Sequence, residues 1–576
     1  MKIARVFTCL ILVLILAVPG AYAGQEDRTV LNYSLWAGAH YTGFEDYSKK
    51  VGEYNRGEDE AYPELIFNLI SRNKDGYLAL DGHFYDENNI FANLSYKKGN
   101  RVSFSADYVS LIHQDGQDML AYLEAREWLG TSPGGKMITH ELQDVGADYN
   151  TDRHQIRSSL DVLLSKKNNI RLSVDHRSII ERGTEQKLSI SHCFSCHVVS
   201  READLKQATH QVKAGLEGDV GDFTVGYFFG YRKFESTGSE LLANYDPAVH
   251  PINGGSGVEF TTRLIYDGEE LPYGLYPETE KMSHTGRLSG RLGRGKLAGS
   301  LGYTSTENKT TTLETESWNG TLNYATPLNK KLRLVGKVTA LRLMADNVFI
   351  DLPTWRLTRP DNHPVNFDYT RYSSVARIQG TGTLELIAQL DPKTSLSFLG
   401  GYQRSERVDY PTPEDPYTTN KYIGQFKVRH RANDKFSGSF KYRYEKTTDP
   451  LRSERGLLEA MGRYDLDIIT VGTNNWAFYY QREDLRYLNV TSLPTDKHVV
   501  DVSGTVKPRK DLSMTLGVKG SYDQNNDFEL IDVNHFAVQP NVNLTMLPSD
   551  GVILSAGYNF NYAKSTGPVA IPMFDG

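Results

Sequence analysis

Residues 439–445 read Ser-Phe-Lys-Tyr-Arg-Tyr-Glu, and this short stretch decides the fold class. Phe440, Tyr442 and Tyr444 take every second position, and the residues between them are polar or charged. Because side chains of a β-strand alternate between its two faces, the stretch predicts a strand with one aromatic face and one charged face. Charges in mid-strand fit a water-filled interior better than a second packed layer.

The same alternation recurs along the chain, for example in residues 512–519 and 552–562. Short polar turns separate the strands, and from residue 392 onward the turns recur about every 40 residues. Each interval holds two strands of about 10–12 residues, the length that an outer-membrane barrel uses. We therefore predict an all-β fold, a large transmembrane antiparallel β-barrel of about 24–26 strands. A soluble sandwich, propeller or solenoid also alternates, but no blade-like or solenoid repeat is visible.

Composition narrows the function classes. The 576 residues include 71 acidic and 64 basic side chains, with a formal charge of −7, and the mean hydropathy is −0.47. After residue 23 no apolar run is long enough for a membrane helix, which excludes a helix bundle. Mild acidity argues against a nucleic-acid partner. No nucleophile–base or paired-carboxylate motif stands out, so we do not expect an enzyme.

The first segment, residues 1–23, is predicted to be a cleaved signal peptide. Lys2 and Arg5 give a positive start, residues 11–18 an apolar core, and residues 21–23 a small-x-small cleavage site. The protein is therefore expected to be exported to the bacterial outer membrane.

The remaining chain, residues 24–576, is predicted to be the barrel, in contact with the lipid bilayer. Its long external loops are expected at 112–150, 181–203 and 235–280. The last residues, 570–576, look like a loop rather than a strand, so we expect that a final strand is missing.

One motif carries chemistry. Cys193, Cys196 and His197 form C-x-x-C-H, the attachment signature of a covalent c-type haem. Two thiols at this spacing meet the two vinyl groups of one porphyrin, and His197 would be the proximal ligand of the haem iron. His192 and His210 are candidate distal ligands. The same two cysteines could instead form a strained disulfide or redox pair, and a zinc site lacks a second cysteine pair. No other cofactor is predicted.

The motif lies near the midpoint of one long hairpin, between short turns near residues 167 and 219. If the short turns are periplasmic, the motif is at the outer end of the barrel. A barrel of this size encloses a wide lumen. Strand-like alternation begins at Val30, which leaves no room for a globular plug before it, so inward-folded loops or a partner protein must fill the lumen.

The signal peptide, the long plug-free chain, the Tyr-rich hairpins and the C-x-x-C element together resemble the decahaem-associated outer-membrane porins, the MtrB/PioB-type sheaths of porin–cytochrome conduits. The resemblance implies a sheath around a periplasmic multihaem c-type cytochrome held in the lumen, with an outer-surface cytochrome as a further partner. It implies electron transfer across the outer membrane.

The leading hypothesis is therefore such a cytochrome sheath, with a haem of its own at the C-x-x-C-H motif. The main alternative is a passive or substrate-specific outer-membrane porin whose cysteines form a loop disulfide. A secreted soluble β-protein with redox or haem-binding activity is the third interpretation.

Overall fold

The structure is a computed structural model. It describes residues 30–43, 53–54, 60–119, 139–191, 197–244, 264–265, 270–350, 356–357, 369–451, 491, 493–526, 533–549 and 551–567. In these residues no helix is long and apolar enough to cross a membrane.

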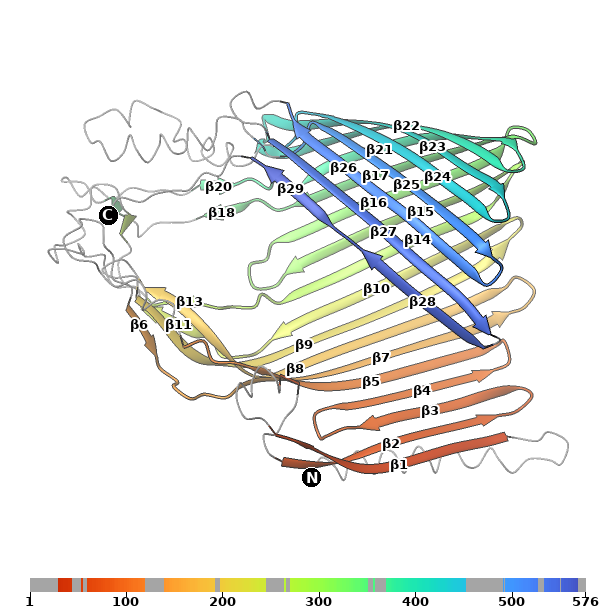
Figure 1. Cartoon of the computed structure of the whole chain (residues 1–576). Coiled ribbons are helices and arrows are strands. Elements are labelled where there is room, and N and C mark those ends of the chain that lie inside the picture. The colour runs from red at the N-terminus through yellow and green to blue at the C-terminus, as the bar shows by residue number, and fades with distance from the viewer. Residues whose placement is uncertain are drawn as a thin grey trace.

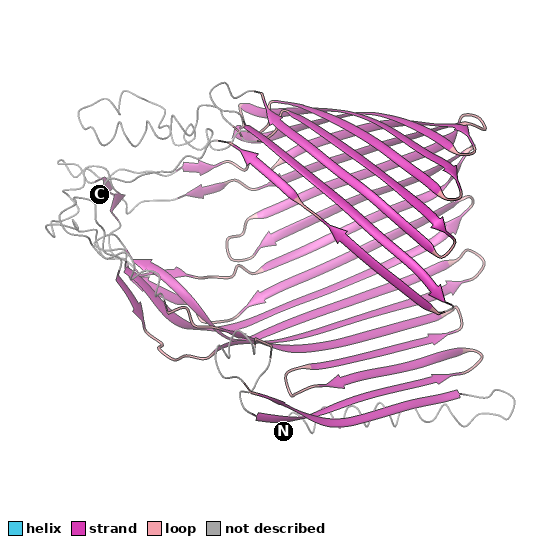
Figure 2. Ribbon diagram, in the orientation of Figure 1, coloured by secondary structure: helices cyan, strands magenta, loops and turns pink. Residues whose placement is uncertain are grey.

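A single sheet of 23 strands dominates the described chain. Each strand of its wall pairs antiparallel with its neighbours in the sequence of wall strands, and Figure 1 shows the strands tilted and wrapped around a common axis. One short strand, β6, instead pairs parallel with β9. Figure 2 shows that the coloured part of the chain is strand and loop. The predicted all-β fold is confirmed, and the observed count lies just below the expected 24–26.

The first half of the wall consists of fairly uniform strands, with one much longer pair. Its members are β1 (Val30–Thr42), β2 (Glu60–Arg72), β3 (Gly76–Phe84), β4 (Ile90–Lys98), β5 (Val102–Asp115), β7 (Tyr149–Ser165), β8 (Ile170–Ser191), β9 (His197–Val220), β10 (Phe223–Ser236), β14 (Thr279–Leu292) and β15 (Gly295–Asn308).

The second half continues in the same way and ends on two short strands that both pair with β27. Its members are β16 (Glu314–Pro327), β17 (Leu332–Ala345), β21 (Arg377–Asp391), β22 (Thr394–Thr412), β23 (Asp415–Asn433), β24 (Phe436–Thr448), β25 (Asp496–Arg509), β26 (Leu512–Asn525), β27 (Val533–Ser549), β28 (Val552–Asn559) and β29 (Tyr562–Thr566).

The remaining strands are short and lie in the long connections. They are β6 (Thr139–Leu142), β11 (Leu241–Asn244), β12 (Leu264–Ile265), β13 (Glu270–Tyr273), β18 (Val348–Ile350), β19 (Arg356–Leu357) and β20 (Tyr369–Arg371). Apart from β6, they pair among themselves as β11–β13, β12–β19 and β18–β20.

Alternation along each strand gives the wall two chemically different faces. Cross-strand partners share a face, and the register places Phe398 opposite Phe426, which in turn faces Tyr442. The rings of Phe398 and Phe426 have centroids 4.9 Å apart. Leu, Val, Phe, Tyr and Trp continue this face around the sheet. We call it the lipid face, and we call the opposite, polar face the luminal face.

The apolar side chains of the lipid face are exposed rather than packed in a core. Few apolar side chains of the described residues are buried, whereas Leu301, Val338 and Phe398 are each more than half exposed. Water would make that exposure costly, but hydrocarbon would not. The apolar contacts of this fold are therefore made with lipid.

The two ends of the wall differ. At one end every connection is a short turn, as at 99–101, 221–222, 293–294, 392–393 and 434–435. The other end carries the long connections and the strands β6, β11, β13, β18 and β20, seen opposite the short turns in Figure 1. In outer-membrane barrels short turns face the periplasm and long loops face outward.

The expected loop at 181–203 is largely strand. β8 continues to Ser191 and β9 begins at His197, with Ser191 opposite His197. The alternation of this segment continues past the bilayer, so the hairpin stays hydrogen-bonded there. Of the other two expected loops, 112–150 contains β6 and 235–280 contains β11, β12 and β13.

The two outer strands of the sheet are not joined to each other. Within the described residues β1 pairs only with β2, and β28 and β29 pair only with β27. The expected additional strand stays a prediction, as does the signal peptide, which lies outside the described residues.

We expect an added charge to cost much more stability on the lipid face than on the luminal face. Val338 on the lipid face and Thr339 on the luminal face are neighbours in the middle of β17. Val338→Arg should destabilise the folded barrel by about 2–4 kcal/mol because it places a charge in hydrocarbon, whereas Thr339→Arg should cost under about 1 kcal/mol. Urea titration of the protein in lipid vesicles measures both. Equal losses would contradict the assignment of the faces.

Candidate functional site: the luminal wall and the outer hairpin

The luminal face carries a dense set of polar contacts across neighbouring strands. In the second half of the wall, ion pairs connect adjacent strands at N–O distances of 2.9–3.3 Å, namely Lys421–Glu445, Lys441–Asp501 and Lys497–Asp523. In the first half, Asn68 donates to Asp81 and Asn93 to Asp107. Such a wall can line water or contact the surface of a soluble protein.

A cluster of histidines lies on the luminal face at the start of the wall. The His40 ring stacks on Tyr85 with centroids 3.7 Å apart, and Glu64 Oε1 lies 2.7 Å from His83 Nε2. His40 Nδ1 is 4.0 Å from Glu64 Oε2. No group of three or more His, Cys, Asp or Glu in the described chain is arranged to hold a metal ion. The cluster therefore connects β1, β2 and β3 through polar and ring contacts.

Between β1 and β2, the described residues Glu53 and Tyr54 contact β5 and the connection between β3 and β4. The Glu53 carboxylate lies 2.7 Å from His113 Nε2, and the Gln114 amide donates to the Glu53 carbonyl. The Asn89 side chain donates to the Tyr54 carbonyl. The carboxylate of Glu53 raises the pKa of Tyr54, with a smaller contribution from burial. Glu53 and Tyr54 therefore link this part of the chain to β5 and to the β3–β4 connection through polar contacts.

The longest strands of the wall, β8 with 22 residues and β9 with 24, form a hairpin that we call the outer hairpin. The adjacent wall strands β7 and β10 have 17 and 14 residues, so the outer hairpin extends beyond them on the long-loop side. Its two strands are paired as far as Ser191 and His197. Of the C-x-x-C-H motif, only His197 belongs to the described residues.

The structure describes only part of the predicted haem site. His192, Cys193 and Cys196 lie outside the described residues, and His197 is the first residue of β9. His210 lies further along β9, where its Nδ1 is 3.0 Å from the Ser178 hydroxyl. At about 3.3 Å per residue the separation from His197 is about 40 Å, so the structure does not bring His210 to the motif.

The outer hairpin is braced from two sides. β6 pairs with the first residues of β9, from Thr139↔His197 to Leu142↔Ser200. On the other strand, Lys187 Nζ donates to the Tyr276 hydroxyl at 2.8 Å, and this hydroxyl donates to Glu185 Oε2 at 2.7 Å.

We call Lys187, Glu185 and Tyr276 the hairpin clasp. The Lys187 ammonium also lies 4.0 Å from the centroid of the Tyr276 ring. Burial alone would lower the pKa of Lys187, but its hydrogen bonds to Tyr276 and Glu185 raise that pKa on balance. Lys187 is therefore charged at neutral pH, and the clasp fixes the hairpin to the connection before β14.

Sequence reasoning missed both braces. Lys187 and Tyr276 are 89 positions apart, and β6 lies far from β9 in the chain. No periodicity or local motif joins segments at that separation.

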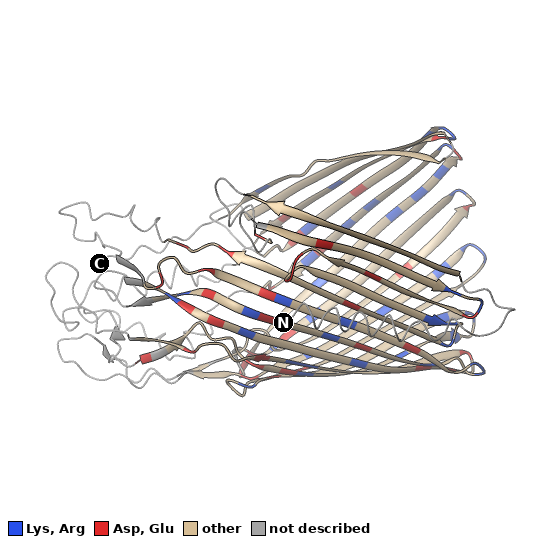
Figure 3. Ribbon diagram, turned by 90° about the horizontal axis from the view of Figure 1, so that it is seen from below, with Lys and Arg blue, Asp and Glu red and all other residues tan. Residues whose placement is uncertain are grey.

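The charges on the luminal face are not balanced everywhere. Figure 3 shows Lys and Arg along the strands and at the short-turn end. Several of the short turns there carry lysine or arginine, at Arg101, Lys166, Lys167, Arg294, Lys330, Lys331, Lys393, Lys435 and Lys510. The periplasmic rim is therefore rich in positive charge.

The tilted antiparallel wall, its exposed apolar face and its polar luminal face define the class of the protein as an outer-membrane β-barrel. The family model described as outer membrane beta-barrel porin, MtrB/PioB, matches residues 44–449. This is most of the chain, and the chain belongs to that family. Porins are defined by the passage of solutes through their lumen rather than by a catalytic activity.

Other comparisons add little. No curated protein sequence matches the chain. Similar solved structures include the FrpB iron transporter (F3-3 variant) from Neisseria meningitidis, 9% identical with a TM-score of 0.44, covering 92% of this chain and 76% of that one. A mutant of the ferric enterobactin receptor PfeA from Pseudomonas aeruginosa is 10% identical with a TM-score of 0.44, covering 93% and 74%. These scores carry no argument about function.

We expect the hairpin clasp to stabilise the outer hairpin locally rather than the whole barrel. Tyr276→Phe removes the hydroxyl between Lys187 and Glu185, so amide hydrogen exchange in the outer half of β8 should become about tenfold faster. Lys206→Ala on β9 is the matched control, because Lys206 pairs only with the exposed Asp204 on its own strand. Exchange rates in β14 to β17 should not change in either variant. Equal protection in wild type and Tyr276→Phe would contradict the clasp.

Proposed function

We propose that the barrel is a sheath for a periplasmic multihaem c-type cytochrome and supports electron transfer across the outer membrane. The observation that supports this proposal is the wide wall itself, 22 described strands with a polar face turned inward. The small sheets outside the wall, such as β11–β13 and β18–β20, lie at the long-loop end in Figure 1. This placement supports the proposal, because these small sheets do not occupy the short-turn half of the lumen.

The physical need for such a sheath comes from the bilayer. Its hydrocarbon core is about 30 Å thick, too far for an electron to cross in one tunnelling step. A chain of haems can divide that distance into short steps if a protein tube keeps lipid away from it. A polar luminal face suits contact with a soluble cytochrome, and the lipid face meets the hydrocarbon.

The two ends of the barrel differ, and this difference indicates which partner would bind at each end. The short-turn end is open to a periplasmic cytochrome, while the outer hairpin projects on the opposite side. An outer-surface cytochrome that accepts or supplies electrons would meet the barrel there.

We further propose that Cys193 and Cys196 attach one c-type haem, with His197 as the proximal ligand of the iron. This proposal is supported by the spacing of the three residues in the sequence and by His197, the first residue of β9 in the outer hairpin. Of the candidate distal ligands, His210 is about 40 Å from His197 along β9, so we propose His192.

A haem-stained denaturing gel of the protein from its native outer membrane tests both proposals. The sheath predicts covalent haem in a co-purifying band, and the motif predicts haem in the barrel's own band. The double variant Cys193→Ser/Cys196→Ser should remove the second signal and leave the first. With no haem in any band the sheath fails, and a porin with a disulfide between Cys193 and Cys196 becomes the better interpretation.

A further inference from the structure

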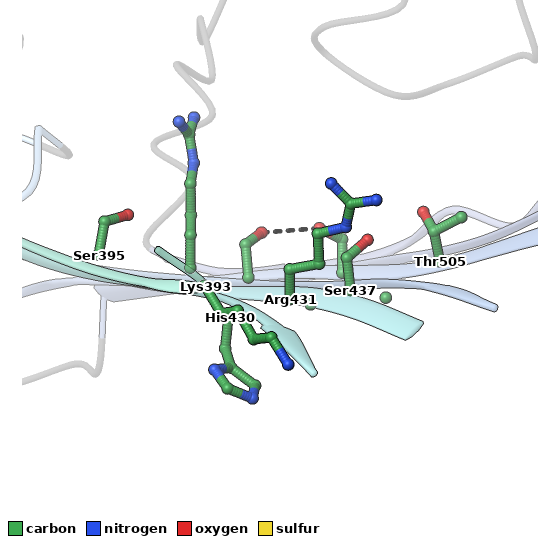
Figure 4. A pocket seen from close by; sticks show the side chains of 11 residues that line it. Lys393, Ser395, His430, Arg431, Ser437 and Thr505 are labelled. Atoms are coloured by element: carbon green, nitrogen blue, oxygen red, sulfur yellow. Dashed lines mark hydrogen bonds between the residues drawn. The ribbon is translucent and has the colours of Figure 1, made fainter. Parts of the chain in front are cut away.

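Four basic side chains gather on the luminal face of β23 and β24, in the half of the wall next to the short turns. We call Lys427, Arg429, Arg431 and Lys441 the basic luminal patch. Arg429 and Arg431 alternate with His430, and Figure 4 shows Arg431 and His430 on opposite sides of the sheet. The alternation of β23 therefore directs the arginines into the lumen.

The patch is only partly neutralised by the barrel. Lys427 is the direct cross-strand partner of Lys441, an arrangement of like charges that costs stability. Asp501 pairs with Lys441 at 3.1 Å, and Arg431 contacts Asp434 at 2.7 Å. Lys427 and Arg429 have no carboxylate in salt-bridge contact within the described part of the chain.

The same strands are balanced further from the short turns. There Lys421 pairs with Glu445 at 3.3 Å, and Arg443 pairs with the same carboxylate at 2.6 Å. The excess of positive charge is therefore local. It lies where a molecule entering from the periplasm would meet the wall.

A hollow beside the patch has the chemistry of an anion site. Its volume is about 260 Å³, and it is lined by the two arginines together with small hydroxyl residues from β22, β24 and β25, namely Ser395, Ser437, Ser439, Ser503 and Thr505. Figure 4 shows Ser395, Arg431, Ser437 and Thr505 on one side of the sheet. The Ser439 and Ser503 hydroxyls are joined by a hydrogen bond of 2.8 Å. Guanidinium and hydroxyl donors are the groups that bind carboxylates.

We propose that the basic luminal patch docks an acidic surface of the protein that occupies the lumen. The inference rests on the proposed function, and it adds the chemistry by which the occupant is recognised. Aspartate and glutamate side chains of the occupant supply the negative charge that the wall lacks, and the short side chains of the hollow leave room for them. The patch faces away from the bilayer, so lipid headgroups do not reach it.

Charge reversal tests the docking. The double variant Lys427→Glu/Arg429→Glu should retain about tenfold less haem-containing protein per barrel after purification from the native outer membrane. In the wild type, retention should fall as ionic strength rises, because salt screens charge pairs that water can reach. The ratio of haem absorbance to barrel protein measures both effects. Unchanged retention in the double variant would overturn the proposal.

A matched control and a neutral variant complete the test. Lys337 also lies on the luminal face, towards the short-turn end of β17, and its cross-strand partners are Asn323 and Thr383. The Lys337→Glu variant reverses this charge and should retain the haem protein. Lys427→Gln/Arg429→Gln should show an intermediate loss. Heat-modifiable gel mobility establishes that each variant is folded.

A partner-free measurement separates this proposal from the proposed function. Fluorescein-labelled poly-L-glutamate should bind the detergent-purified wild type and Lys337→Glu, and should bind the double reversal about tenfold more weakly. If no haem protein accompanies the wild type, the sheath fails while this binding still decides whether the patch takes carboxylates. Equal binding by all variants would overturn the patch itself.

Discussion

The pairing of backbone groups is the constraint on which this structure depends. Hydrocarbon offers no hydrogen-bond partner, so every N–H and C=O at membrane depth must be satisfied by another strand. The wall does this between neighbouring strands from β1 to β27, and β28 and β29 pair with β27; in the described residues the outer edges of β1, β28 and β29 have no partner strand. Because this pairing uses only backbone atoms, each side chain is free to be chosen for the medium that its face meets.

That freedom produces the two faces and their division of roles. Residues such as Val338 and Phe398 are exposed because lipid, rather than a protein core, covers them. The luminal face can then hold charges that a packed interior would exclude. Most of its ion pairs join neighbouring strands, but Lys427 and Arg429 are left for an occupant. An open lumen of this width would leak, so something must fill it. The unpaired positive charge of the luminal face near the periplasmic end favours a negatively charged protein as the occupant.

Periodicity predicted what depends on neighbouring residues, and no more. The alternation at Phe440, Tyr442 and Tyr444 identified the faces correctly, and the register of β24 with β23 and β25 confirms them. A loop was expected at 181–203, and the described residues of that segment are paired strands of β8 and β9. The β6–β9 pair and the hairpin clasp join distant segments, and no local signal encodes them. The uncompensated Lys427 could not be recognised either, since its partner Lys441 is known only once the strands are in register.

Ion conductance of single barrels in planar bilayers tests the filled lumen most directly. The protein would be studied as purified with the proteins that stay bound to it, and again after these are removed with high salt. The account predicts a nearly closed barrel in the first state and a large conductance in the second, because the occupant blocks the lumen. An equally large conductance in both states would contradict it and would favour an open porin.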